Sequence, residues 1–170
     1  MQILATSRLR LREMEQADAP FILELLNEPA FIQNIADKGV RTLADAEAYI
    51  ENGPRASYAR HGYGLFVVEL LSTGEAIGIC GLVKRDELED ADVGYAILQR
   101  HWSRGYAVEA ASATVQYGLG KLGMARVLGI TAPHNRGSIR VLERCGLRSA
   151  GMTDLPRYGG SNCLFTTDPA

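Results

Sequence analysis

The stretch Trp102-Ser103-Arg104-Gly105-Tyr106-Ala107-Val108-Glu109-Ala110 decides the fold of this chain. A run of β-forming residues, 91–98, ends just before it, and a long helical pattern begins at about Tyr106. A strand-to-helix turn with glycine at its tip leaves backbone N–H groups unpaired at the positive end of a helix, and such groups bind phosphate. Arg104 adds a fixed positive charge with a forked set of donors. A single glycine in such a turn is also typical of an ordinary helix start, so this segment alone leaves both interpretations open.

Length and composition exclude several classes of protein. The chain has 170 residues and a formal net charge of −2. We expect one domain, 1–170, with a sizeable core, and no basic field that would attract nucleic acid. No apolar run has membrane-spanning length, and the N-terminus lacks the long apolar stretch of a signal peptide, so no membrane partner is predicted.

Cysteine and histidine usage gives little sign of a redox or metal site. The cysteines are odd in number, lie far apart and form no CxxC pair: Cys80, Cys145 and Cys163. This usage fits a reduced, cytoplasmic protein with buried or idle thiols, although a catalytic cysteine stays open. His61, His101 and His134 have no metal-ligand spacing, so we predict no metal. We expect His101 to be a surface residue beside the turn.

The apolar patterns predict alternating helical and β-rich parts. Helical spacing predicts helices at 19–27 and 42–51, the second ended by Asn52-Gly53-Pro54, with 31–40 and 55–63 as loops or short helical pieces. After the turn, helices are expected at 106–122 and from Asn135 or Gly137 to about 146. The acidic stretch 86–92 is expected to be a solvated turn. The expected strands are 8–14, 64–71, 76–83, 93–98, 126–132 and a final pair around 147–151 and 163–166.

Four motifs in this order resemble the GNAT superfamily of N-acetyltransferases, and most closely its branch that acetylates N-terminal amines of ribosomal proteins. They are Ser7-Arg8-Leu9-Arg10-Leu11-Arg12, Val93-Gly94-Tyr95-Ala96-Ile97, the stretch 102–110, and Asn135-Arg136-Gly137-Ser138-Ile139-Arg140-Val141-Leu142-Glu143-Arg144-Cys145-Gly146-Leu147. Together they span nearly the whole chain and favour the phosphate-binding interpretation of the turn. Ser103 departs from the glycine usual in this branch, and a serine restricts φ.

The resemblance implies an α/β GNAT fold with a mixed, mostly antiparallel sheet of roughly six or seven strands and helices on both faces. It also implies acetyl-CoA as cosubstrate, held where the strands 93–98 and 126–132 splay apart. Asn135 would contact the pantetheine or hold its loop as a helix N-cap; both interpretations stay open. The implied cofactor-binding residues are Ile97 and Leu98 on the strand, Ser103, Arg104, Gly105, Tyr106 and Ala107 in the turn, and Asn135.

The resemblance also frames the catalytic candidates. Many GNATs carry a tyrosine that protonates the leaving thiolate where this chain has Leu142, which leaves Ser138 as the candidate donor on that helix. Ser138 is also typical of a first-turn residue that bonds the backbone. Asp92 is the candidate base, acting directly or through water, although its acidic surroundings also fit a solvated turn. For Glu109, in the first turns of a helix, a structural role is favoured over catalysis.

The acceptor is less constrained than the cosubstrate. Near pH 7 about a tenth of α-amines are neutral, against roughly one in a few thousand lysines, so a weak base favours an α-amine. We therefore expect direct acetyl transfer to a protein or peptide N-terminus by a monomer or homodimer. The alternatives are a small-molecule amine (antibiotic, polyamine or amino acid) and a non-catalytic acyl-CoA-binding module.

Overall fold

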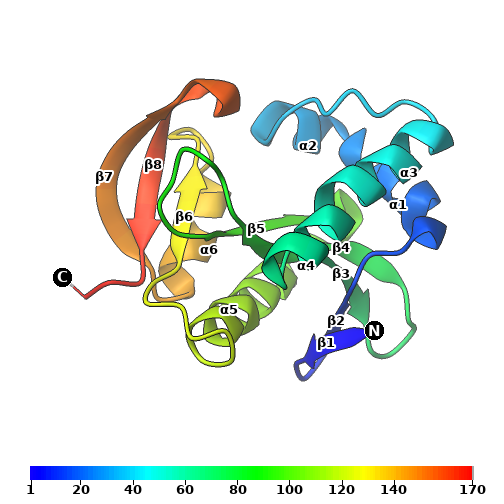
Figure 1. The fold of residues 1–170 in the computed structure, drawn as a ribbon, viewed down its shortest axis with the longest axis horizontal. Helices are drawn as coiled ribbons and strands as arrows, with labels where there is room; N and C mark the ends of the chain where they lie inside the picture. The colour runs from blue at the N-terminus through cyan, green and yellow to red at the C-terminus, as the bar shows by residue number, and fades with distance from the viewer. Residues whose placement is uncertain (170) are drawn as a thin grey trace.

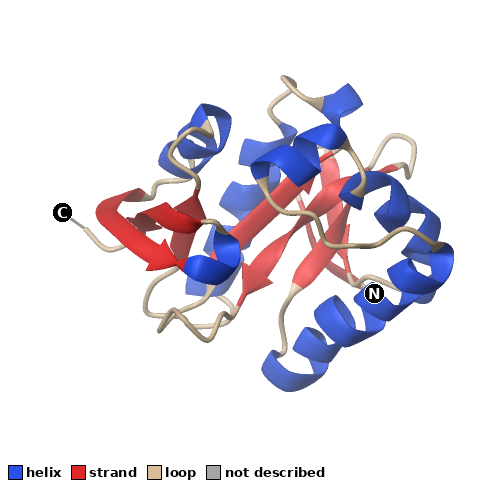
Figure 2. Cartoon of the chain, turned by 90° about the horizontal axis from the view of Figure 1, so that it is seen from above, coloured by secondary structure: helices blue, strands red, loops and turns tan. Residues whose placement is uncertain are grey.

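The computed structural model describes residues 1–169 and contains one eight-stranded sheet with helices on both of its faces (Figure 2). The strand order is β1-β2-β3-β4-β5-β6-β8-β7, and every neighbouring pair is antiparallel except β5 and β6. The strands are β1 (Gln2–Ala5), β2 (Leu9–Arg12), β3 (Leu65–Leu70), β4 (Ala76–Val83), β5 (Asp92–Ile97), β6 (Leu128–Thr131), β7 (Arg148–Leu155) and β8 (Gly160–Thr166). The mixed, mostly antiparallel sheet is confirmed; its eighth strand is β1, which the sequence patterns did not predict. Figure 1 shows β7 and β8 at the left end of the molecule and β1 and β2 at its lower edge, next to the N-terminus.

Six α-helices and four short helical turns connect these strands. The helices are α1 (Ala19–Leu26), α2 (Pro29–Asn34), α3 (Leu43–Ile50), α4 (Ala56–His61), α5 (Tyr106–Leu119) and α6 (Arg136–Arg144), and the turns are η1 (Gln16–Asp18), η2 (Glu51–Arg55), η3 (Gln99–His101) and η4 (Pro156–Tyr158). The α-helix α3 ends at Ile50, close to the predicted end at about Glu51, but Asn52-Gly53-Pro54 do not break the chain into a loop. These residues lie in η2, a π-helical turn that joins α3 to α4. A widened turn accommodates a proline that an α-helical turn would not.

Two apolar clusters cover the two faces of the sheet. Phe66 and Val68 of β3 pack with residues of α5 and α6, whereas Val67, between them, packs with residues of α1 and α3. This alternation follows from the two-residue period of a strand that is buried on both sides. The middle strands are therefore covered on both faces, and a ligand can reach them only where two neighbouring strands separate.

That parting lies between β5 and β6. The two strands are parallel but share one register pair, Asp92 with Leu128, next to which the Leu128 N–H donates to the Ala91 carbonyl at 2.9 Å. Beyond this point they diverge. Asp92 is the first residue of β5 and is 1% exposed, so the expectation that it belongs to a solvated turn is wrong.

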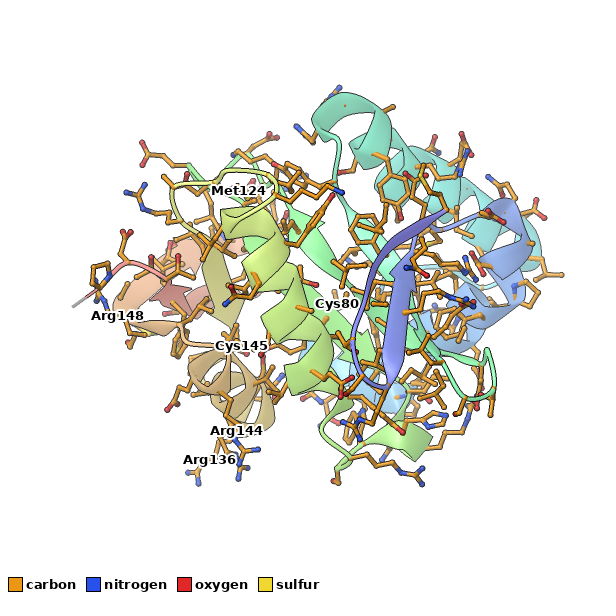
Figure 3. The ribbon with its side chains drawn as sticks, turned by 90° about the horizontal axis from the view of Figure 1, so that it is seen from below. Cys80, Met124, Arg136, Arg144, Cys145 and Arg148 are labelled. Atoms are coloured by element: carbon orange, nitrogen blue, oxygen red, sulfur yellow. The ribbon has the colours of Figure 1, made fainter. Side chains whose placement is uncertain are left out.

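The three cysteines are unpaired. Cys80 lies on β4 beneath α5 and Cys145 at the end of α6 (Figure 3). Burial raises the pKa of Cys80 to about 12, which leaves its thiol protonated and unreactive at neutral pH. Among residues 1–169, no helix is long and apolar enough to cross a membrane, and no three metal-binding side chains gather.

Candidate active site

A cleft of about 900 Å³ occupies the gap between β5 and β6. One part of its wall is formed by the start of α5 and by α6. The other part is formed by α2 with the loop after it and by the turn between β7 and β8. Most of the sequence-predicted site residues line it: Asp92, Ile97, Ser103, Gly105, Tyr106, Ala107, Asn135 and Ser138. Leu98 and Arg104 do not.

The turn before α5 presents backbone donors to this cleft. Gly105 is the N-cap of α5 with φ +82°, and no side chain among the described residues caps the helix. The first hydrogen bond of the helix runs from the Glu109 N–H to the Gly105 carbonyl at 3.0 Å. The N–H groups of the first helical turn, which come before Glu109, therefore have no partner within the helix. Ser103 has φ +63°, the left-handed region that favours glycine, which agrees with the glycine that the resemblance leads us to expect at this position. The turn therefore has the donors and the helix polarity that an anionic diphosphate requires.

The N-terminal segment braces this turn through Arg8. The Arg8 guanidinium donates from Nε to Glu109 Oε1 at 2.7 Å and from Nη1 to the Arg104 carbonyl at 2.9 Å, and it lies 4.5 Å from the centre of the Tyr106 ring. The Thr6 hydroxyl donates to the second oxygen of Glu109. Burial acts in the opposite direction, but these hydrogen bonds lower the pKa of Glu109. Glu109 therefore joins the turn to the start of the sheet.

The edge of β5 presents backbone donors to the cleft, and that of Ile97 lies nearest the turn before α5. The Leu98 N–H donates to the Ile77 carbonyl at 2.8 Å, which makes Ile97 and Gly78 a pair without mutual hydrogen bonds. The N–H and C=O of Ile97 therefore point away from β4, and the C=O accepts the Trp102 indole N–H at 2.7 Å. Leu98 is fully buried, with its donor used within the sheet. The expectation that Leu98 binds the cosubstrate is therefore withdrawn.

Asp92 lies at the floor of the cleft and is held by Arg85. Its Oδ1 accepts from Arg85 Nε at 2.8 Å and its Oδ2 from Arg85 Nη2 at 3.3 Å. Burial raises the pKa of Asp92, and the charge of Arg85 opposes this shift. A face of the same guanidinium lies over the Tyr158 ring, with its carbon 4.3 Å from the ring centre, so Arg85 is held by Asp92 at its edge and by Tyr158 at its face.

Ser138 and Asn135 meet at the start of α6. The Asn135 side chain accepts the Ser138 N–H at 3.2 Å, so Asn135 is the helix N-cap. The Ser138 hydroxyl lies 2.8 Å from the Tyr95 hydroxyl, which crosses the cleft from β5. Leu142, one turn further along α6, is fully buried and has no proton to donate. The hydroxyls of Ser138 and Tyr95 therefore meet at this end of the cleft.

Sequence reasoning missed several residues of the site. Tyr95 stands in one of the motifs and Arg8 in the opening strand, but the sequence shows no individual role for either, because their partners lie far along the chain. Arg85 and Lys38 line the cleft without belonging to any motif. The prediction of a surface position for His101 is wrong, since it is 9% exposed and its Nε2 lies 3.0 Å from Glu75.

Comparison with known proteins agrees with this geometry. Residues 8–148 match the Acetyltransferase (GNAT) domain family. The protein YkkB of Bacillus subtilis (strain 168) is 32% identical over 148 residues, which are 85% of this chain and 84% of YkkB. An acetyltransferase structure from Agrobacterium tumefaciens str. C58 superposes with a TM-score of 0.80 at 25% identity, covering 98% of this chain and 94% of that one. A ribosomal-protein α-N-acetyltransferase in complex with coenzyme A superposes with a TM-score of 0.82 at 15% identity, covering 99% and 100%. The chain therefore belongs to the GNAT family, and it is an N-acetyltransferase with acetyl-CoA as its cosubstrate.

Proposed function

We propose that this enzyme acetylates the α-amine of a protein or peptide N-terminus by direct attack, without an acyl-enzyme. The observation that carries the proposal is a single cleft that joins a phosphate-type helix start to a pair of diverging parallel strands. The reaction forms a C–N bond and breaks the thioester C–S bond. One proton leaves the amine nitrogen and one ends on the sulfur of coenzyme A.

The residues of the cleft fit the cosubstrate. The backbone of Ser103, Arg104 and Gly105 and the first N–H groups of α5, at Tyr106 and Ala107, would hold its diphosphate. Two cations of α6, Arg140 and Arg144, line the same wall, and Figure 3 shows Arg136 and Arg144 extending to one side of this helix. Acetyl-CoA supplies the activated acetyl group.

Three groups would then act at the reacting end. The Ile97 N–H would bond the pantetheine arm or the oxyanion, a kind of contribution worth about 3–4 kcal/mol in other enzymes. Asp92 would take the amine proton, directly or through water, and its raised pKa makes it a better base near neutrality than an ordinary aspartate. Ser138 would donate a hydrogen bond to the sulfur, with Tyr95 holding its hydroxyl. Asn135 would keep this corner of α6 in place.

The choice of an α-amine rests on chemistry. A base that is already paired with Arg85 is a modest one, and an α-amine has far more neutral form at pH 7 than a lysine. Structural neighbours include proteins named as a ribosomal-protein-serine acetyltransferase and as a spermidine N-acetyltransferase, at 20% identity each. At that identity they support the fold alone.

Thiol release from acetyl-CoA tests the proposal. The full chain is given N-terminal peptides, peptides whose only amine is a lysine, polyamines, and amino acids. Turnover highest with α-amines supports the proposal. Turnover restricted to lysine side chains or polyamines would overturn it, and tight coenzyme A binding without turnover on any amine would remove catalysis altogether.

A further inference from the structure

Charge is distributed unevenly within the cleft. We call the part lined by Lys38, Arg85, Asp92, Tyr158 and Asn162 the acceptor half. It lies where α2 and the loop after it face the turn between β7 and β8 (Figure 1), apart from the start of α5. In the proposed function the cosubstrate enters along α5 and α6, so the acceptor half receives the amine.

The acids of the cleft are already engaged. Both oxygens of Asp92 accept from Arg85. Glu28, the other carboxylate along the lining, accepts the Gln99 N–H at 3.0 Å near the far end of β5. Among the described residues, the acceptor half therefore holds no free carboxylate with which to bind a second ammonium group.

The cations are in excess. Arg85 is fixed between Asp92 and the ring of Tyr158, and its charge acts on Lys38. Partial desolvation and the charge of Arg85 lower the pKa of Lys38, although its side chain stays exposed. No carboxylate of residues 1–169 lies within ion-pair distance of Lys38. The acceptor half thus has two positive charges, on Lys38 and Arg85, and one negative charge, on Asp92, which is already paired with Arg85.

We propose that the acceptor amine carries a carboxylate close to it, which Lys38 binds while Arg85 supplies the second positive charge. The proposal rests on the proposed acetyl transfer in this cleft: an acidic side chain would narrow the peptide substrate, and an α-carboxylate would move the acceptor to a free amino acid. The carboxylate has two sources, the α-carboxylate of a free amino acid or an acidic side chain among the first residues of a peptide.

The same charges select against other amines. A polyamine would bring its additional ammonium groups into a positive field, where like charges repel. The carboxylate of the accepted substrate instead offsets the charge of Lys38, so these cations act on substrate binding and leave deprotonation of the amine to Asp92.

Matched amines test the inference. With saturating acetyl-CoA, thiol release is measured for alanine against alaninamide and for the peptide amide Ala-Asp-Ala against Ala-Asn-Ala, with spermidine as the polycation. We expect kcat/KM at least about fivefold higher for the acid in one pair, and that pair identifies the source of the carboxylate. Neutral partners or spermidine used as well as the acids would overturn the inference and leave acetyl transfer intact. No thiol release with any amine would instead remove the proposed function.

A substitution of Lys38 tests whether this residue causes the preference for acidic acceptors. Lys38→Gln should reduce the acid-over-neutral ratio about fivefold and leave the KM for acetyl-CoA unchanged. The matched control is Lys121→Gln, whose ammonium lies 6.0 Å from the Tyr117 ring and outside the cleft, and it should alter neither quantity. A Lys38→Gln enzyme that keeps the full ratio would overturn the assignment of Lys38.

Discussion

The guanidinium of Arg8 and the carboxylate of Glu109 meet at 2.7 Å, although 101 residues separate them in the sequence. One comes from the loop that leads into β2 and the other from the first turns of α5. Their contact, together with the bond from Arg8 to the Arg104 carbonyl, ties the phosphate-type turn to the sheet. The turn is thus held from behind while its backbone donors stay free for a ligand.

This brace predicts that Arg8→Gln weakens coenzyme A binding about fivefold to tenfold, because the turn loses its forked partner and samples other conformations. Turnover at saturating acetyl-CoA should change by less than about twofold. Calorimetry with coenzyme A measures the first quantity and steady-state kinetics the second. Arg8→Lys should recover only part of the affinity, since an ammonium cannot bridge Glu109 and the Arg104 carbonyl in the same geometry.

Arg126→Gln is the matched control, since Arg126 also joins distant segments, through Asp90 and Asp168, but lies outside the cleft. It should leave coenzyme A affinity unchanged. Equal loss of affinity in the two variants would mean that Arg8 acts on overall stability rather than on the turn.

Gly105 gives a second test of the turn. A valine there meets a φ of +82° and a neighbouring Arg8 Nη2 at 3.3 Å, so Gly105→Val should deform the turn and weaken coenzyme A binding by more than about tenfold. Gly123→Val imposes similar backbone strain at φ +66° in open space away from the cleft. Both variants should lose stability in thermal unfolding, but only Gly105→Val should lose affinity. Unchanged affinity in Gly105→Val would refute the assignment of this turn to the diphosphate.

Local sequence patterns predicted most of the fold. The alternation and apolar runs gave β4 its observed bounds, 76–83, and the helical spacing located α1, α3, α5 and α6 to within a few residues. These signals are local, because each element must bury one face or both. β1 escaped prediction because Gln2–Ala5 lacks the polar–apolar alternation that marks β2, and its pairing with β2 supplies the order that its own sequence lacks.

The candidate site was only partly predictable. The turn before α5 and the N-cap at Asn135 follow from residue types at fixed offsets. The burial of Asp92 does not, because an aspartate that ends an acidic stretch resembles a solvated one until Arg85 and the start of β6 close over it. The contact of Tyr95 with Ser138 likewise depends on how α6 packs against the sheet, which no spacing along the chain records.

Asp92→Asn tests the proposed base. Because burial raises the pKa of Asp92, wild-type turnover should fall as the pH drops through that pKa and the carboxylate becomes protonated. Asparagine does not titrate, so the variant should lose this limb of the profile of kcat against pH and turn over at least about tenfold more slowly. Asp90→Asn, which removes a partly exposed partner of Arg126, is the control and should keep the wild-type profile. An unaltered profile in Asp92→Asn would remove this residue from the mechanism.

Ser138 and Tyr95 give the last prediction, which separates direct action from support. Ser138→Ala removes the hydroxyl proposed to stabilise the leaving thiolate, so kcat should fall about tenfold while the KM for acetyl-CoA changes little. Tyr95→Phe keeps the ring in its packed position and removes the hydroxyl that bonds both the hydroxyl and the carbonyl of Ser138, so its loss of kcat should be smaller.

A double-variant cycle decides whether Tyr95 works through Ser138. If it does, adding Tyr95→Phe to Ser138→Ala should cost no further turnover, because the hydroxyl that Tyr95 orients is already gone. Tyr117→Phe, on α5 outside the cleft, should behave as wild type in either background. Equal losses from Tyr95→Phe with and without the Ser138 hydroxyl would show that the tyrosine acts on the reaction independently of the serine.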